Sequence, residues 1–266
     1  MIFSTIKHAS ISINNDGACE ILGRLIARCD SLVCESLENA KYTDLHLSRT
    51  PQGLVLDWRQ SKAQTLKYNI DFEKEFAKHR TFPIPKQGAF NQALGKKTHS
   101  VIDASGGWGG DAILMCMQGY QLTIIERVPL MAALIDDALV RLAGSPLFQG
   151  KGLTLPKVIC GEASTILPSL VGNADCVYLD PMFPPKKKKS AASNKQMQLL
   201  QWLLGEDLDA SDTAISAYNN FPRVAVKRPD YAQSLAQDEI GLPEVKFSSK
   251  LVHYDVYLAD NSSAKS

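Results

Sequence analysis

The sequence predicts an α/β protein whose main body is a mostly parallel sheet covered by helices on both faces, preceded by a smaller α+β domain. Two observations predict this fold. From about residue 100, short apolar runs that end in an acid alternate with segments whose apolar residues recur at helical spacing. Two alternating apolar runs close the chain, at 245–248 and 251–258. These runs predict an antiparallel hairpin at the edge of the sheet.

The elements of the main domain are expected in the order strand, helix, strand. Strands are predicted at 100–104, 121–126, 155–160, 175–180 and 223–227, and helices at 111–119, 129–142, 163–170 and 195–204. Pro129 suits the first turn of its helix, because the N–H that proline lacks has no intrahelical partner there. The alternation favours one continuous βα domain over 100–259.

The first hundred residues follow a different pattern. Residues 45–47 and 54–58 look like strands, and residues 17–29 and 72–79 look helical. We therefore expect a small α+β domain at 1–75 and a basic connecting segment at 76–99. The segment from Phe76 to Ser100 contains lysine, arginine and histidine but no acid. Residues 260–266 are small and polar, and we expect a disordered tail there.

Composition excludes several functional classes. The 266 residues carry a net charge of +1, so any nucleic-acid contact must rest on local clusters of charge. The six cysteines form no C-x-x-C pair and no zinc spacing with histidine, so no metal is predicted. No apolar run approaches the roughly 20 residues of a membrane span, and no signal core is seen. We expect a cytoplasmic protein that binds no membrane.

A glycine loop follows the first predicted strand of the main domain. Asp103 ends that strand, and Gly107, Gly109 and Gly110 follow it before a helix. Such glycines let the backbone approach a ligand closely. A dinucleotide site remains open, because Ala112 stands where the third glycine of that motif would be. Asp103, however, would repel a pyrophosphate and attract an ammonium group, which favours S-adenosyl-L-methionine. A packing turn without a ligand is the third interpretation.

Two acids after the next strands extend this interpretation. Glu126 lies nineteen residues after Gly107 and could accept hydrogen bonds from ribose hydroxyls, as either cofactor would require. Glu162 follows the third strand and could accept from an adenine amino group. The alternative for Glu126 is a solvated acid paired with Arg127. The alternative for Glu162 is an exposed acid at a helix N-terminus, where a negative charge is favoured.

The segment Asp180-Pro181-Met182-Phe183 is the most specific feature. An exocyclic base amine is a poor nucleophile, because its lone pair is delocalised into the ring. Asp180 and the Pro181 carbonyl could hold its N–H groups, and Phe183 could stack on the base. The reaction would then depend mainly on positioning. The alternative is a proline-rich strand exit with Phe183 as a core residue.

Basic residues surround this segment. We expect contacts with RNA phosphates from Lys186, Lys187, Lys188 and Lys189, from Lys227 and Arg228, and from the basic stretch 76–100. The alternatives are a solvated loop for the four lysines, and ion pairs with nearby acids for Lys227 and Arg228.

The ordered set of 103–111, 126–137, 178–184 and 226–230 resembles the RsmJ family, the guanine-N2 methyltransferases of 16S ribosomal RNA. The resemblance implies a Rossmann-like class I methyltransferase fold, S-adenosyl-L-methionine as cofactor, and small-subunit ribosomal RNA or the assembling small subunit as partner. It implies cofactor contacts at Gly110, Asp111, Glu126, Arg127, Glu162, Ala163 and Asp180. Three alternatives stay open: an amino-methyltransferase for another RNA or DNA base, an NAD-dependent oxidoreductase, and a non-catalytic RNA-binding protein.

Overall fold

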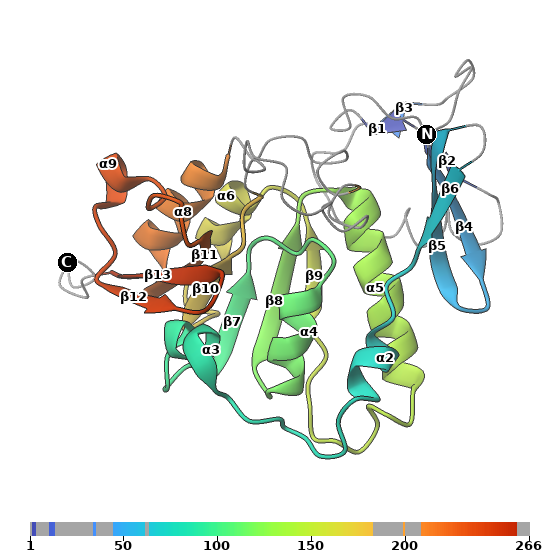
Figure 1. Cartoon of the computed structure of the whole chain (residues 1–266), viewed down its shortest axis with the longest axis horizontal. Helices are drawn as coiled ribbons and strands as arrows, with labels where there is room; N and C mark the ends of the chain where they lie inside the picture. Colours follow the sequence, from blue (N-terminus) through green and yellow to red (C-terminus); the bar gives the residue numbers. More distant parts are fainter. Residues whose placement is uncertain are drawn as a thin grey trace.

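The computed structural model describes residues 2–3, 11–13, 34–35, 45–61, 64–182, 199 and 209–259 (Figure 1). Its main feature is a seven-stranded sheet in the order β12-β13-β11-β10-β7-β8-β9. The strands are β7 (Ser100–Asp103), β8 (Gln121–Glu126), β9 (Lys157–Cys160), β10 (Cys176–Leu179), β11 (Arg223–Pro229), β12 (Val245–Ser248) and β13 (Val252–Leu258). The strands from β9 to β11 are parallel, and β13 runs antiparallel to both β11 and β12. The predicted mixed sheet and closing hairpin are confirmed.

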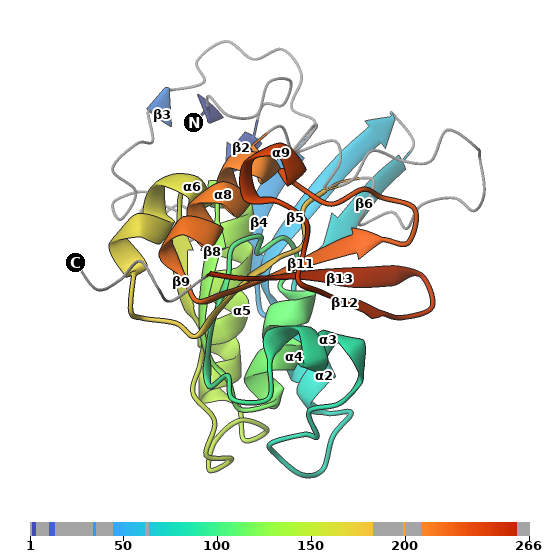
Figure 2. The same cartoon turned by 90° about the vertical axis from the view of Figure 1, so that its left-hand side faces the viewer.

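Helices cover both faces of this sheet, as Figures 1 and 2 show. One face packs against α2 (Phe72–Phe76), α3 (Gly88–Leu94), α4 (Gly110–Met117) and α5 (Pro129–Gly144). The other face packs against α6 (Ala163–Ile166), the 3-10 helix η1 (Leu167–Leu170), α8 (Ala210–Asn220) and α9 (Gln237–Ile240). Alternate strand residues enter the two apolar cores: Tyr178 lies in one and Val177 in the other. Burial on both faces explains why these strands read as continuous apolar runs.

The N-terminal region forms two small sheets. One pairs β1 (Ile2–Phe3) with β3 (Cys34–Glu35); the other has the order β2 (Ile11–Ile13), β4 (Leu45–Thr50), β5 (Gly53–Ser61) and β6 (Gln64–Tyr68). The two predicted strands correspond to β4 and β5, whereas β6 was not predicted. The helix expected at 17–29 lies outside the described residues, as do 260–266.

The four-stranded sheet stands beside α5, away from β12 and β13 (Figure 1). The backbone N–H of Leu54 donates to Asp137 Oδ2 at 2.9 Å, and the Nε of Arg141 donates to the same oxygen at 2.9 Å. Leu47 and Leu54 belong to the apolar cluster that includes α4 and α5. The N-terminal sheet therefore shares its core with the main sheet, and the boundary at residue 75 stays a prediction.

The basic segment lies at the opposite end of the strands from their carboxyl ends. The carbonyl of His99 accepts from the N–H of Gln121, and the N–H of His99 donates to Asp175 at 2.8 Å. Gln121 is the first residue of β8, and Asp175 directly precedes β10, so both partners lie at the amino ends of parallel strands. This segment contains α3, which was not predicted, and Lys86 lies 3.5 Å from the centre of the Tyr120 ring. The segment thus lies away from the carboxyl ends of the strands, and its expected contact with RNA phosphates stays a prediction.

Candidate active site

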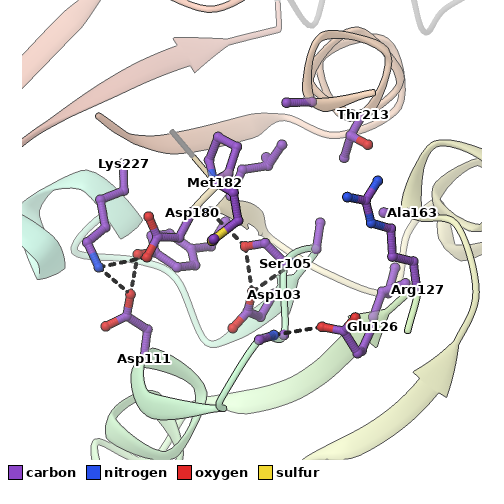
Figure 3. A pocket seen from close by; sticks show the side chains of 18 of the residues that line it. Asp103, Ser105, Asp111, Glu126, Arg127, Ala163, Asp180, Met182, Thr213 and Lys227 are labelled. Carbon is purple, nitrogen blue, oxygen red and sulfur yellow. Dashed lines mark hydrogen bonds and ion pairs between the residues drawn. The ribbon is translucent and has the colours of Figure 1, made fainter. Parts of the chain in front are cut away.

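A pocket of about 280 Å³ opens at the carboxyl ends of β7, β8 and β10. Most of the predicted cofactor and catalytic residues line it: Asp103, Gly107, Gly110, Asp111, Glu126, Arg127, Glu162, Ala163, Asp180 and Pro181. Sequence reasoning did not assign Ser105, Tyr178, Asp209 or Thr213 to the site, although they also line the pocket, and it assigned Lys227 to RNA (Figure 3). Phe183 lies outside the described residues.

The glycine loop and Glu126 hold each other in place. The N–H of Gly107 donates to Glu126 Oε2 at 2.7 Å, and the N–H of Val128 donates to Oε1 at 2.7 Å. A Cβ on Gly106 would lie 2.8 Å from Ile124 Cγ2, so glycine is required for this close approach. An ionised carboxylate offers about four lone-pair sites, so each oxygen can still accept a hydroxyl. The arrangement fits the predicted ribose contact, which stays a prediction.

Gly109 lies outside the pocket lining. Its φ of 71° is in the left-handed region, and a Cβ there would lie 2.8 Å from Phe72 Cζ. The residue therefore allows α4 to begin close to the N-terminal segment. Its predicted contact with the cofactor has no support in this geometry.

Asp103 is buried beneath the pocket, with 2% of its surface exposed. Its Oδ1 accepts from the backbone N–H of Ser105 at 3.0 Å and from its hydroxyl at 3.2 Å. The Ser105 oxygen in turn accepts from the N–H of Asp180 at 2.7 Å. Burial raises the pKa of Asp103 to about 7, and the charges of Asp111 and Asp180 add to that rise against the hydrogen bonds from Ser105.

Lys227 lies between two acids of the pocket. Its Nζ is 2.9 Å from Asp111 Oδ2 and 2.8 Å from Asp180 Oδ2 (Figure 3). Burial lowers the pKa of Lys227, but the two carboxylates outweigh that effect and raise it above its ordinary value. The ion-pair interpretation of Lys227 therefore holds in this structure, and its predicted contact with RNA stays a prediction.

Arg228 also has a partner within the protein, and its predicted contact with RNA stays a prediction. Arg228 follows Lys227 in a strand and points to the opposite face of the sheet. Only 7% of its surface is exposed, and its guanidinium donates to the carbonyl of Gln233. This geometry therefore leaves little of the Arg228 side chain open to solvent. The other predicted RNA contacts, Lys186–Lys189, lie outside the described residues.

An ion pair joins the two sides of the pocket. Arg127 follows β8 and contacts Asp209, the residue before α8. Ala210 and Thr213 from the start of α8 line the pocket beside it. The predicted helix at 195–204 lies outside the described residues except for Leu199, which is helical, and α8 was not predicted.

The charges of the pocket fit a cationic cofactor. Asp103, Asp111, Asp180 and Glu126 face it, whereas Lys227 is shared by two of them and Arg127 is engaged with Asp209. Surplus negative charge attracts a sulfonium and an ammonium group and repels a pyrophosphate. The residues therefore fit S-adenosyl-L-methionine better than NAD. Among the described residues, no group of three or more histidine, cysteine or acidic side chains could hold a metal ion, and no helix could span a membrane.

Comparisons with known proteins agree with this geometry. Residues 32–259 match the family described as "Putative SAM-dependent methyltransferase". The chain is 34% identical over 232 residues to ribosomal RNA small subunit methyltransferase J of Aeromonas salmonicida, covering 85% of this chain and 91% of that protein. It is 36% identical over 195 residues to the protein of the same name from Actinobacillus pleuropneumoniae, covering 71% and 75%.

A solved structure extends the match to the fold. The SAM-dependent methyltransferase NGO1261 from Neisseria gonorrhoeae is 25% identical, with a TM-score of 0.63 over 95% of this chain and 96% of that one. The predicted fold and cofactor class are confirmed, and the oxidoreductase and non-catalytic alternatives are set aside. The chain belongs to the family of SAM-dependent methyltransferases that includes the ribosomal RNA small subunit methyltransferase J proteins.

Proposed function

We propose that this protein transfers a methyl group from S-adenosyl-L-methionine to the exocyclic N2 of a guanosine in small-subunit (16S) ribosomal RNA. The observation that carries the proposal is the position of Asp180 and Pro181. They follow β10 and line the same pocket as the glycine loop and Glu126. The name shared by the relatives supports the choice of RNA.

The chain's own groups suit an amine nucleophile. Asp180 can accept one N–H of N2 and the Pro181 carbonyl can accept the other, which directs the nitrogen lone pair into the pocket. Bound cofactor supplies an electrophilic methyl group on a positively charged sulfur. Asp180 and Pro181 would hold N2 toward that methyl group, so that the N2–carbon bond would replace the carbon–sulfur bond and the electron pair of the latter would stay on sulfur. The N2 proton passes to the Asp180 carboxylate, whose pKa is raised by burial against the charge of Lys227.

The direct test is methyl transfer to small-subunit RNA and to particles that lack the modification. Digestion of the product to nucleosides should yield N2-methylguanosine. Asp180→Asn should lower kcat by about 10²-fold or more, because it removes the proton acceptor, while changing the affinity for S-adenosylhomocysteine much less. Asp175→Asn is the matched control, since Asp175 precedes the same strand at its other end. Its kcat should stay unchanged.

Two results would contradict the proposal. One is a methylated base other than guanine, or methylation at an atom other than N2. The other is an Asp180→Asn variant that retains its turnover. Because the affinity for S-adenosylhomocysteine is measured separately, a loss of folding or of cofactor binding is distinguished from a loss of chemistry.

A further inference from the structure

Lys227 is the centre of a charged network that links the two halves of the pocket. Asp111 lies on α4, directly after the glycine loop, whereas Asp180 follows β10 at the proposed reacting edge. The Lys227 ammonium lies within 2.9 Å of a carboxylate oxygen of each. Its side chain is 24% exposed, so these contacts are partly shielded from water and are stronger than surface pairs.

A buried aromatic side chain anchors one end of the network. The hydroxyl of Tyr178 donates to Asp111 Oδ2 at 2.5 Å, and no surface of Tyr178 is exposed. Its ring meets that of Phe90 edge to face, with centroids 5.3 Å apart. Asp111 therefore has little freedom, and it fixes the position of the Lys227 ammonium that it shares with Asp180.

We propose that Lys227 is a positioning residue that holds Asp180 ionised and oriented for the transfer. This inference rests on the proposed function, in which Asp180 receives a proton. Lys227 uses only Oδ2 of Asp180, and none of the described side chains donates to Oδ1. The second oxygen is thus left for the substrate amine, while the backbone N–H of Asp180 is held by Ser105.

The surroundings of Asp180 show why one cation matters. Its titratable neighbours in the described part of the chain are Asp103 from β7, Asp111 from α4, Tyr178 from β10, Lys227 from β11 and Tyr254 from β13. Burial raises the pKa of Asp180 and Asp111 raises it further, whereas Lys227 lowers it. Without Lys227 the carboxyl would therefore take up a proton at higher pH, and a protonated Asp180 cannot receive the N2 proton.

The test measures the protonation of Asp180 and the turnover separately. The Asp180 carboxyl is titrated by carbon-13 NMR, with Asp180→Asn to identify its signal, and kcat is followed against pH at saturating cofactor and RNA. Lys227→Met should raise the midpoint of the Asp180 titration, and the acid limb of the kcat profile, by about one to three pH units. Lys227→Arg should leave both close to wild type, because it keeps the charge.

Two further variants control for damage to the fold. Asp111→Asn is nearly isosteric and removes a negative charge, so it should move both midpoints to lower pH, in the opposite direction. Lys246→Met removes another lysine of the same sheet, 3.4 Å from Asp255 and outside the pocket, and should change neither. A double variant of Lys227→Met with Asp180→Asn should be no slower than Asp180→Asn alone, because both act through one carboxylate.

The outcomes separate the inference from the proposed function. Unchanged midpoints in Lys227→Met, or a double variant with additive losses, would overturn the positioning role. Absence of N2-methylguanosine with wild-type protein would overturn the proposed function, while the NMR titration would still decide whether Lys227 controls Asp180.

Discussion

The buried carboxyl of Asp103 should make cofactor binding depend on pH. We expect the ammonium group of S-adenosylhomocysteine to bind the ionised form of Asp103, whose pKa in the ligand-free protein is raised to about 7. About nine-tenths of these carboxyls are ionised at pH 8 and about one-tenth at pH 6. The affinity should therefore fall about tenfold between these two values, or about 1.4 kcal/mol of binding free energy. As the pH falls from 8 to 6 the amino group of the ligand only gains protons, so its titration cannot cause the loss of affinity.

Calorimetric titration with S-adenosylhomocysteine at pH 6, 7 and 8 measures this effect. Repeating it in buffers of different ionisation enthalpy should reveal a proton released on binding near pH 7. Asp103→Asn should bind weakly and with little dependence on pH, because its amide does not titrate. A wild-type affinity that is the same at pH 6 and pH 8 would refute the reasoning.

The Asp103 carboxyl also predicts how the stability of the ligand-free protein depends on pH. This dependence would not be expected if the ionised carboxyl served only to stabilise the fold. Its folded pKa of about 7 lies above the ordinary 3.8, so the folded state holds the proton more tightly than the unfolded state. Its contribution to stability is therefore fully present below the unfolded pKa of 3.8 and is lost progressively as the pH rises to the folded pKa of about 7. The difference of about three pKa units corresponds to up to about 4 kcal/mol. Asp103→Asn should thus leave the ligand-free protein at pH 8 at least as stable to heat as wild type.

Three further predictions concern the fold and the RNA contacts. Asp137→Ala should lower the free energy of unfolding by about 2–3 kcal/mol in denaturant titrations, because it leaves the N–H of Leu54 without an acceptor. Asp137→Asn keeps an acceptor oxygen, so it should lower the free energy of unfolding less. Gly109→Ala should lower the free energy of unfolding by at least about 1–2 kcal/mol, because the residue has a positive φ and its new Cβ would clash with Phe72. The adjacent Gly110→Ala is the control and should not destabilise the protein, since nothing lies within 4 Å of its Cβ. Equal melting temperatures of the two variants would contradict this prediction. Replacing Lys186–Lys189 together should reduce the salt dependence of RNA binding by up to about 3 in log–log slope, and an unchanged slope would exclude phosphate contacts from them.

The strands around the pocket could be predicted because several local signals agree there. The bounds of β8 were predicted to the residue, since an apolar run follows a glycine turn and ends in Glu126. The α5 helix was found from its first-turn proline and its apolar spacing. By contrast, α8 is rich in small polar residues, and α3 is a seven-residue helix that begins with glycine. Such helices depend on packing against the sheet, which a local pattern does not encode.

The roles of the basic residues depended on contacts that are distant in sequence. Lys227 is 116 residues from Asp111 and 47 from Asp180, so its ion pairs could not be read from its neighbours. One conclusion was nevertheless within reach. Side chains alternate across a strand, so Lys227 and Arg228 were expected to point to opposite faces of the sheet. The prediction that both contact RNA did not use this alternation.

The charge of the pocket also bears on product release. Transfer of the methyl group removes the sulfonium charge. Once Asp180 has passed its new proton to solvent, Asp103, Asp111 and Asp180 remain, the last two with Lys227 as their shared counter-ion. A site with surplus negative charge therefore loses part of its attraction for the spent cofactor at the moment the reaction is complete. Lys227 limits this surplus without cancelling it. The same lysine that keeps Asp180 ready for a proton thus leaves the pocket selective for the charged cofactor over its neutral-sulfur product.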